Sequence, residues 1–372
     1  MRSYDEILKS DEAITLSLRE LYHRYGYTQY KMSKFEEYDL YAKNKDFLIS
    51  DNIITFTDTN GKLMALKPDV TLSIVRNSRQ NTQSVQKVYY NENVYRISER
   101  SHAFREIMQA GLECIGDVDE YYRIEVMLLA AQSLKCISPR CKLTISHLDI
   151  VSEAVDALNL SDSDRIEVLR CIGQKNIHEL TKICTLAEAD ADKVEALRSL
   201  IAICGAPNEV LGKLREMGCN SEAVDELSRV CNAMNANGLN DIVSIDFSIV
   251  SDMRYYNGLV CKGFVDGVPT SVLSGGEYNK LMQKMGSKNK AIGFAVYMDA
   301  LERLYERKND YDVDTVLLYD DSTDVNVLCQ TVRLLTQGGT QVMAQKSLPD
   351  KLRYKQLVRL NGNGVEILEN NA

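Results

Sequence analysis

One stretch of the chain alternates apolar and polar side chains so that an amide and a carboxylate share a surface. In residues 107–115, a period of two sends one set to the core side of a strand: Met108, Ala110, Leu112 and Cys114. Gln109, Gly111 and Glu113 fall on the opposite face. The glycine predicts a shallow floor between the two polar groups, which suits a small zwitterion whose ammonium group meets the carboxylate. The alternative is a solvated sheet face with a glycine bulge.

Three further segments carry groups that could contribute to such a site. Asp69 and Thr71 follow Pro68 in the predicted first turn of a helix, where free N–H groups and side-chain oxygens converge. Residues 251–258 contain Tyr255 and Tyr256, and residues 274–279, a predicted glycine turn before a helix, contain Tyr278. The alternatives are a helix-stabilising charge for Asp69 and simple packing for the tyrosines.

The elements that must position these residues alternate between helices and short strands. The pattern predicts helices at 11–25, 68–77 and 118–134, a hairpin at 53–66, and strands at 85–90, 93–97, 107–115 and 142–146. Further strands are predicted at 242–247, 256–264, 270–273 and 291–296, with a helix from 298 to about 306. This order favours an α/β (α+β) fold, in which an antiparallel sheet is flanked by helices.

Three regions follow from the same pattern. Residues 1–150 and 241–308 form the predicted sheet domain, and the almost purely helical residues 151–240 form an insertion. Residues 311–372 form a small α/β unit, predicted as strand 315–318, helix 325–336, strand 340–344, a helix near 350–358 and strand 364–368. A chain of 372 residues is long enough for two or three such regions.

Composition excludes several classes of function. The formal net charge of −9 opposes nucleic-acid binding, and the Lys and Arg residues are scattered, so no nucleic acid is expected as a partner. None of the ten cysteines forms a Cys-x-x-Cys pair, which predicts no metal site and a reducing, cytoplasmic location. The N-terminal residues do not resemble a signal peptide and no apolar run approaches 18 residues, so no membrane association is expected.

The order of the polar segments resembles a known family. Residues 66–71, 94–96, 104–113, 252–258, 275–278 and 293–295 are similar, in sequence and spacing, to the catalytic domain of histidyl-tRNA synthetases, which are class II aminoacyl-tRNA synthetases. The resemblance covers residues 5–305, includes a helical insertion, and makes the tail look like a truncated anticodon-binding domain. In detail it favours the paralogous regulatory subunits of ATP phosphoribosyltransferase, the first enzyme of histidine biosynthesis.

This resemblance implies a histidine-binding pocket. Asp69, Thr71, Gln109 and Glu113 match the positions that hold the α-amino group, and Tyr256 and Tyr278, with Tyr255 beside them, match the positions that flank the imidazole. Arg96 and Arg105 match the arginine-bearing second motif. The resemblance implies no cofactor. Its implied partners are L-histidine as effector, a short-form catalytic subunit in a hetero-octamer, and a second copy of the chain.

The departures from the synthetase pattern predict a change of function. Ser251 and Ala300 stand where the family has the arginine that activates the carboxylate and the arginine of its third motif, which lies against ATP. Ser33 replaces the proline of the first motif, and the segment between Arg96 and Arg105 is about one residue short and lacks the usual Pro-Gln-x-Gly-Arg loop. Losing two arginines that neutralise phosphate charge should abolish adenylation. The chain is thus predicted to be a non-catalytic histidine sensor.

Two alternatives stay open at this point. One is a divergent histidine-adenylating enzyme in which Arg254 replaces the missing arginine, although an odd shift along a strand would turn that side chain to the other face. The other is an RNA-binding scaffold that uses residues 311–372. That tail is nearly charge-balanced, which makes it the weaker alternative.

Overall fold

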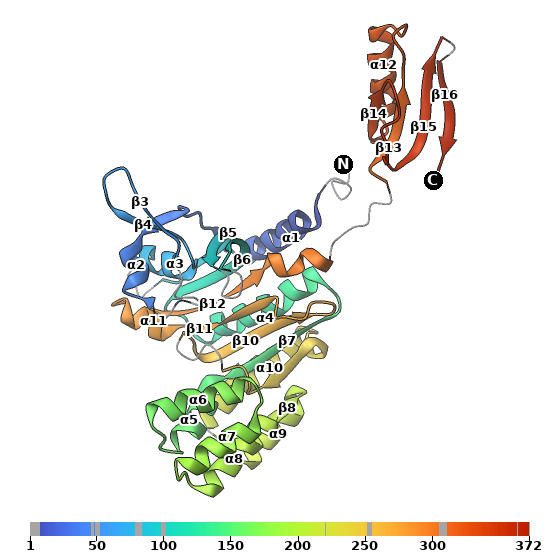
Figure 1. Cartoon of the computed structure of the whole chain (residues 1–372). Helices are drawn as coiled ribbons and strands as arrows, with labels where there is room; N and C mark the ends of the chain where they lie inside the picture. The colour runs from blue at the N-terminus through green and yellow to red at the C-terminus, as the bar shows by residue number, and fades with distance from the viewer. Residues whose placement is uncertain are drawn as a thin grey trace. The chain divides into compact units, whose positions relative to one another are not determined.

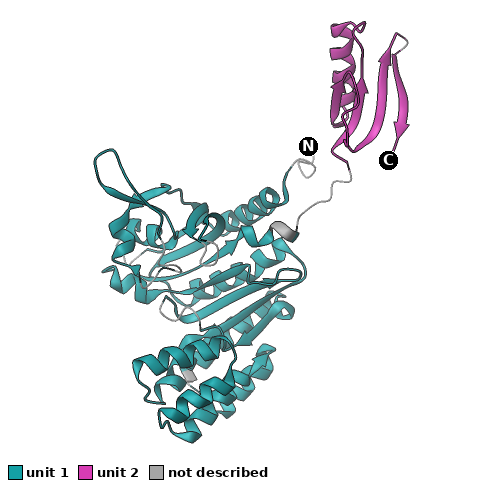
Figure 2. Ribbon diagram, viewed as in Figure 1, with its two compact units in different colours: residues 1–305 teal, residues 306–372 magenta. Residues whose placement is uncertain are grey.

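The computed structural model describes residues 8–45, 48, 53–78, 84–97, 102–219, 221–250, 255–304, 311–362 and 364–371. They belong to two compact units, residues 1–305 and 306–372 (Figure 2). The helical insertion is part of the first unit, and its separation from the sheet as a domain of its own stays a prediction. Ser251 and Arg254 lie outside the described residues. No helix among the described residues is long and apolar enough to cross a membrane.

A nine-stranded sheet forms the centre of the first unit, in the order β1-β5-β6-β12-β11-β10-β7-β9-β8 (Figure 1). The strands are β1 (Thr28–Gln29), β5 (Gln86–Ile97), β6 (Phe104–Gly116), β7 (Cys141–His147), β8 (Cys204–Gly205), β9 (Val243–Asp246), β10 (Asn257–Val265), β11 (Leu273–Glu277) and β12 (Lys290–Tyr297). All neighbours pair antiparallel except β1 with β5 and β7 with β9. The predicted antiparallel sheet is therefore confirmed for its central strands, and the two predicted strands at 85–97 are one.

The two faces of this sheet differ in chemistry. One face carries Leu112, Cys114 and Phe294, and helices α1 (Ser10–Arg24) and α4 (Glu120–Ile137) cover it with their buried apolar side chains. Because side chains alternate along a strand, Gln109, Gly111 and Glu113 point the other way. Cross-strand register adds further residues to this second face, which we call the polar face: Tyr90, Gly293, Ala295, Ser274 and Lys262.

A helical insertion connects β7 to β9. Its helices are α5 (Leu148–Asp156), α6 (Asp162–Gly173), α7 (Ile177–Leu186), α8 (Ala191–Ala202), α9 (Pro207–Glu216) and α10 (Ser221–Ala236), followed by the 3-10 helix η3 (Asn240–Ile242). Side chains of Ser161, Asn176 and Asp190 cap the N-termini of α6, α7 and α8. Leucine and isoleucine side chains join the insertion to the same apolar core as the sheet.

Shorter elements close the polar face and correct two predictions. A small sheet, β2 (Phe35–Glu37), β4 (Leu63–Leu66) and β3 (Thr55–Thr57), lies with α2 (Tyr38–Ala42), α3 (Thr71–Asn77) and α11 (Asn279–Lys284). Helix α3 begins at Thr71, so Asp69 precedes it rather than lying in its first turn. The predicted turn before α11 is wrong, because Ser274 to Glu277 belong to strand β11. The predicted helix after β12 is the 3-10 helix η4 (Met298–Leu304).

The second unit is a four-stranded sheet with one helix. Its elements are β13 (Val313–Leu318), α12 (Val325–Thr336), β14 (Val342–Gln345), β15 (Tyr354–Asn361) and β16 (Gly364–Asn370), in the sheet order β14-β13-β15-β16. The predicted helix near 350–358 is wrong. Leu357 and Val358 lie on opposite faces of strand β15, and each packs in a different apolar cluster.

Candidate functional site

A buried carboxyl group marks the deepest point of the candidate site. Glu113, on β6, is 2% exposed and accepts hydrogen bonds from the Thr71 hydroxyl at 2.6 Å and from the Tyr278 hydroxyl at 2.6 Å. Its carboxyl group lies directly over Gly293 of β12, where the β-carbon of any other residue would collide with it. Burial raises the pKa of Glu113 to about 8, although both hydroxyls lower it. The carboxyl group is therefore close to half protonated near pH 8.

A second buried carboxyl group, that of Asp69, lies near enough to Glu113 for its charge to act on it. Asp69 is 7% exposed, and its Oδ1 accepts the N–H of Leu72 at 2.8 Å, which ties it to the beginning of α3. Burial raises the pKa of Asp69, while the N–H of Leu72 and the nearby Arg96 oppose that rise. Arg96 is itself held by a hydrogen bond from its Nε to the Pro68 carbonyl, at 3.1 Å. The site thus presents two carboxyl groups and one neighbouring cation.

Three tyrosines form an aromatic wall beside these groups. The Tyr255 ring lies 4.6 Å from that of Tyr256, edge to face, and 6.0 Å from that of Tyr278, centroid to centroid. Burial raises the pKa of Tyr255, and the carboxyl group of Asp69 raises it further. The structure therefore brings Asp69, Thr71, Glu113 and the three tyrosines together, as the sequence predicts.

The predicted shallow floor at Gly111 is wrong. Tyr90, directly opposite on β5, is 2% exposed and occupies that space, so that a β-carbon at Gly111 would lie 2.6 Å from the Tyr90 hydroxyl oxygen. Glycine is needed there for the tyrosine. Gln109 is buried on the same face as Glu113, whereas Arg105 is exposed, near the end of the strand. Arg105 is therefore not part of the buried group.

Two residues of the site escaped the sequence prediction. One is Tyr90, and burial together with the charge of Glu113 raises its pKa well above the usual value. The other is Lys67, which is fully buried and forms an ion pair with Glu92, the residue opposite Gln109. The sequence signal for Lys67 is its position directly before Pro68, and for Tyr90 it is the strand register, which no local pattern provides.

The position of the third-motif arginine is apolar. Ala300 lies in η4, directly after β12, and its methyl group packs against the main apolar core. An alanine there can neither pair with a phosphate nor stack on a ring. Ser33 is exposed, and its hydroxyl accepts the Phe35 N–H at 3.1 Å.

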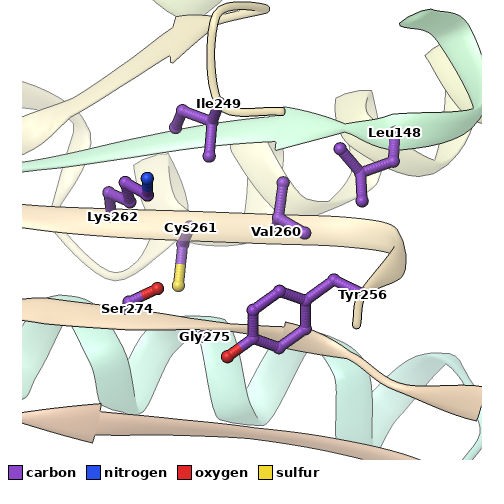
Figure 3. Close-up of a pocket in the computed structure, with 8 residues that line it drawn as sticks. All are labelled: Leu148, Ile249, Tyr256, Val260, Cys261, Lys262, Ser274 and Gly275. Carbon is purple, nitrogen blue, oxygen red and sulfur yellow. The ribbon is translucent and has the colours of Figure 1, made fainter. Parts of the chain in front are cut away.

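A small pocket continues the polar face beyond the tyrosines (Figure 3). Its volume is about 10 Å³, which is room for a single water molecule. Figure 3 shows the Tyr256 ring beside Ser274 and Cys261, with Lys262 on the same strand as Cys261. Among the described residues, no group of three or more His, Cys, Asp or Glu side chains is arranged to hold a metal ion.

Comparisons with known proteins agree on one family. The family model described as histidyl-tRNA synthetase matches residues 5–301. A relative from Oceanobacillus iheyensis, named ATP phosphoribosyltransferase regulatory subunit, is 25% identical over 98% of this chain and 91% of its own length. A relative of the same name from Caldanaerobacter subterraneus subsp. tengcongensis is 30% identical over 78% of this chain and 77% of its own.

Solved structures show the same architecture. One, described as an ATP phosphoribosyltransferase regulatory subunit/histidyl-tRNA synthetase from Bacillus halodurans, has a TM-score of 0.77 at 20% identity and covers 94% of this chain and 93% of its own. A chain of the ATP phosphoribosyl transferase (HisG:HisZ) complex from Thermotoga maritima has a TM-score of 0.62 at 18% identity, covering 77% and 97%. These likenesses confirm the predicted class II synthetase-like fold.

Proposed function

The chain belongs to the histidyl-tRNA synthetase family, and we propose that it serves there as the regulatory subunit of an ATP phosphoribosyltransferase, the first enzyme of histidine biosynthesis. The observation that carries the proposal is a buried cluster, in which Glu113 accepts from Thr71 and Tyr278, together with an alanine at position 300, where the resemblance implies the third-motif arginine. The relatives named as regulatory subunits support it, and so does the solved complex that contains a chain of the same fold.

The ligand of the pocket is free L-histidine. Histidine presents two kinds of N–H donor, an ammonium group and an imidazole, and the site presents two buried carboxyl groups, Asp69 and Glu113. Both oxygens of Glu113 already accept a hydrogen bond from a hydroxyl, so the ammonium group of a ligand would compete with these donors for the same oxygens. Gln109 supplies an amide on the same face, and the tyrosine wall supplies an apolar surface for the ring.

The chain has no transferase or adenylating chemistry of its own. Adenylation develops negative charge on phosphate oxygens, and cationic side chains aimed at these oxygens stabilise its transition state by several kcal/mol. Ala300 has no charged group that could supply this stabilisation. The chain therefore acts on a separate, short-form catalytic subunit, within a hetero-octamer that includes contacts between copies of this chain.

Histidine regulates the assembly by exchanging hydrogen-bond partners inside the pocket. Without ligand, the donors of Glu113 are the hydroxyls of Thr71 and Tyr278, which reach it from α3 and from the end of β11. A cationic ligand competes for the same oxygens and displaces at least one of these segments. Feedback then requires that histidine bind one arrangement of the assembly more tightly than the other, because equal affinity for both would shift nothing.

The experiment is co-expression of this chain with a short-form catalytic subunit. We expect one large complex in size-exclusion chromatography, full transferase activity only in that complex, and inhibition by histidine. Phe104 is exposed at the beginning of β6, so Phe104→Ala is a suitable control for surface changes. Separate elution over a wide concentration range, with an unchanged catalytic rate, would contradict the proposal.

A further inference from the structure

Four side chains with charged or titratable groups meet where the helical insertion joins the sheet, outside the histidine pocket. They are Arg123 of α4, His147 at the end of β7, Glu226 of α10 and Glu277 at the end of β11. Their side chains are 23%, 3%, 13% and 7% exposed, respectively. Largely buried charges need their partners, because a charge left unpaired away from water is strongly destabilising.

The cluster is asymmetric around a single guanidinium. Arg123 forms an ion pair with Glu226, and its Nη1 also lies 4.0 Å from Oε1 of Glu277. On its other side Glu226 lies 3.1 Å from Nε2 of His147. Burial lowers the pKa of His147 to about 4, so the ring is neutral at pH 7 and bonds to the carboxylate through an uncharged N–H. Asp149, in the first turn of α5, is the remaining charge that faces His147 and Glu277.

Glu277 connects this cluster to the histidine pocket. It accepts the N–H of Leu259 at 3.1 Å and lies against Gly258, whose φ of +60° and close approach leave no room for a side chain. Gly258 follows the segment that carries Tyr256, so Glu277 fixes the place where that segment enters β10. The residue directly after β11 is Tyr278, which donates to Glu113. A ligand that moves Tyr278 therefore moves the neighbour of Glu277.

Two other side chains of the cluster lie at the two ends of the helical insertion. His147 is the residue directly before α5, the first helix of the insertion, and Glu226 lies on α10, the last. Arg123 has one carboxylate in contact and a second within reach, and its Nε has no hydrogen-bond partner among the described residues. A guanidinium carries five N–H donors in a planar fork, so Arg123 can pair with either carboxylate, and its contact with Glu277 is the longer of the two.

We propose that Arg123 shifts between Glu226 and Glu277, and that this shift transmits occupancy of the pocket to the helical insertion. The inference rests on the proposed function, because it takes histidine as the ligand that moves Tyr278. In the arrangement seen here, Arg123 holds α10 through Glu226. When the end of β11 moves, Glu277 competes for the guanidinium, and the hold on α10 and on the beginning of α5 loosens. The packing of the insertion against the sheet therefore changes when the ligand binds.

Hydrogen exchange of the full-length chain, with and without saturating histidine, tests this route. In the wild type, histidine should speed amide exchange in α10 and at the beginning of α5. Glu226→Gln keeps the shape but removes the charge, so histidine should still bind by calorimetry while its effect on exchange in α10 falls at least about fivefold, the lower end of usual coupling factors. Arg123→Lys keeps the positive charge but loses the planar guanidinium with its several N–H donors, and it should behave in the same way.

The matched control is a second charge pair between the same two helices. Arg229 of α10 lies 2.7 Å from Glu120 of α4, and both side chains are nearly half exposed, at 45% and 48%. Glu120→Gln should leave the response to histidine as in the wild type, because exposed pairs contribute little. An unaltered response in both Glu226→Gln and Arg123→Lys, with histidine bound, would overturn this inference alone. Absence of histidine binding to the wild type would overturn the proposed function, and the inference with it.

Discussion

Glu113 and Ala300, which lie in two regions of the synthetase-like fold, differ in how many other residues hold their side chains in place. At the amino-acid end, Glu113 is fixed by two hydroxyls from separate elements and by the absence of a side chain at Gly293. At the other end, Ala300 occupies one turn of a short 3-10 helix and touches the apolar core. Removing the carboxyl group of Glu113 would leave two buried hydroxyls without their acceptor, whereas the methyl group of Ala300 has no polar partner to lose.

This difference is what we expect of a fold that has lost its catalytic chemistry and kept ligand recognition. The amino-acid end is an interlocked group that resists single substitutions, because each buried polar atom depends on another. The side chain of Ala300 has no polar atom, so this position can change without leaving a polar group of another residue unsatisfied. The comparison predicts that the catalytic function is lost completely and that histidine recognition is retained.

The largest expected effect is the absence of adenylation. We expect no histidine-dependent ATP–pyrophosphate exchange above the no-enzyme blank, and no charging of tRNA, because the transition-state charge has no partner at position 300. Ala300→Arg alone should not restore exchange, since Ser251 still occupies the other arginine position. The measurement is isotope exchange with the purified chain. Clear exchange in the wild type that disappears in Arg254→Ala would establish the adenylating alternative.

The next effect concerns the most tightly held group. Glu113→Gln keeps the size of the side chain but removes its charge, so histidine inhibition of the complex should weaken about ten- to a hundredfold, from the loss of about 1.5–3 kcal/mol. Basal activity without histidine should change little. Glu106→Gln, on the same strand but exposed, is the matched control and should leave the inhibition curve unchanged. Unchanged inhibition in Glu113→Gln would place the histidine site elsewhere.

The sequence predicts the face of the strand but not what lies over it. Alternation correctly places Gln109 and Glu113 together, because a period of two depends only on local geometry. It cannot place Tyr90 over Gly111, since that neighbour is set by the register of a twelve-residue strand with its partner. Because the sequence pattern does not place Tyr90 over Gly111, it predicts an open floor where the structure has a packed surface.

Glycine-rich residues and short apolar runs produced the other errors. Gly275 and Gly276 are typical of a turn, but in β11 they allow close packing against Phe294 and Tyr256, so tertiary contacts override the local preference. Leu357, Val358 and Leu360 form a short apolar run that is compatible with either a helix or a strand. The roles assigned to Arg105 and to the tyrosines stay predictions, because position alone does not identify a ligand.

A smaller effect on histidine inhibition is expected for Asp69. Asp69→Asn removes the charge but keeps a side-chain oxygen for the Leu72 N–H, and asparagine caps helices about as well as aspartate. The fold should therefore tolerate the change, and histidine inhibition should weaken about tenfold, from a loss of about 1.4 kcal/mol. The measurement is an inhibition curve beside a thermal melt. Asp69→Ala is the contrast, because it should lower the melting temperature as well as the affinity.

The smallest effect is the response of histidine binding to pH. A cationic ligand selects the ionised form of Glu113, whose pKa is about 8 in the free protein, so binding should release a proton and tighten as pH rises. Between pH 7 and pH 8 the ionised fraction of Glu113 rises about fivefold, and the affinity for histidine should rise by about the same factor.

The stability of the free protein should change with pH in the opposite direction. A carboxyl group whose folded pKa is raised contributes stability below its unfolded pKa, near 4.5, and that contribution is lost as pH rises through about 8. Calorimetry over this range measures both the affinity and the proton release, and in Glu113→Gln both pH dependences should disappear. An affinity that does not change with pH in the wild type would show that the ligand does not depend on the ionised form of Glu113, and would leave Asp69 as the group that meets the cation.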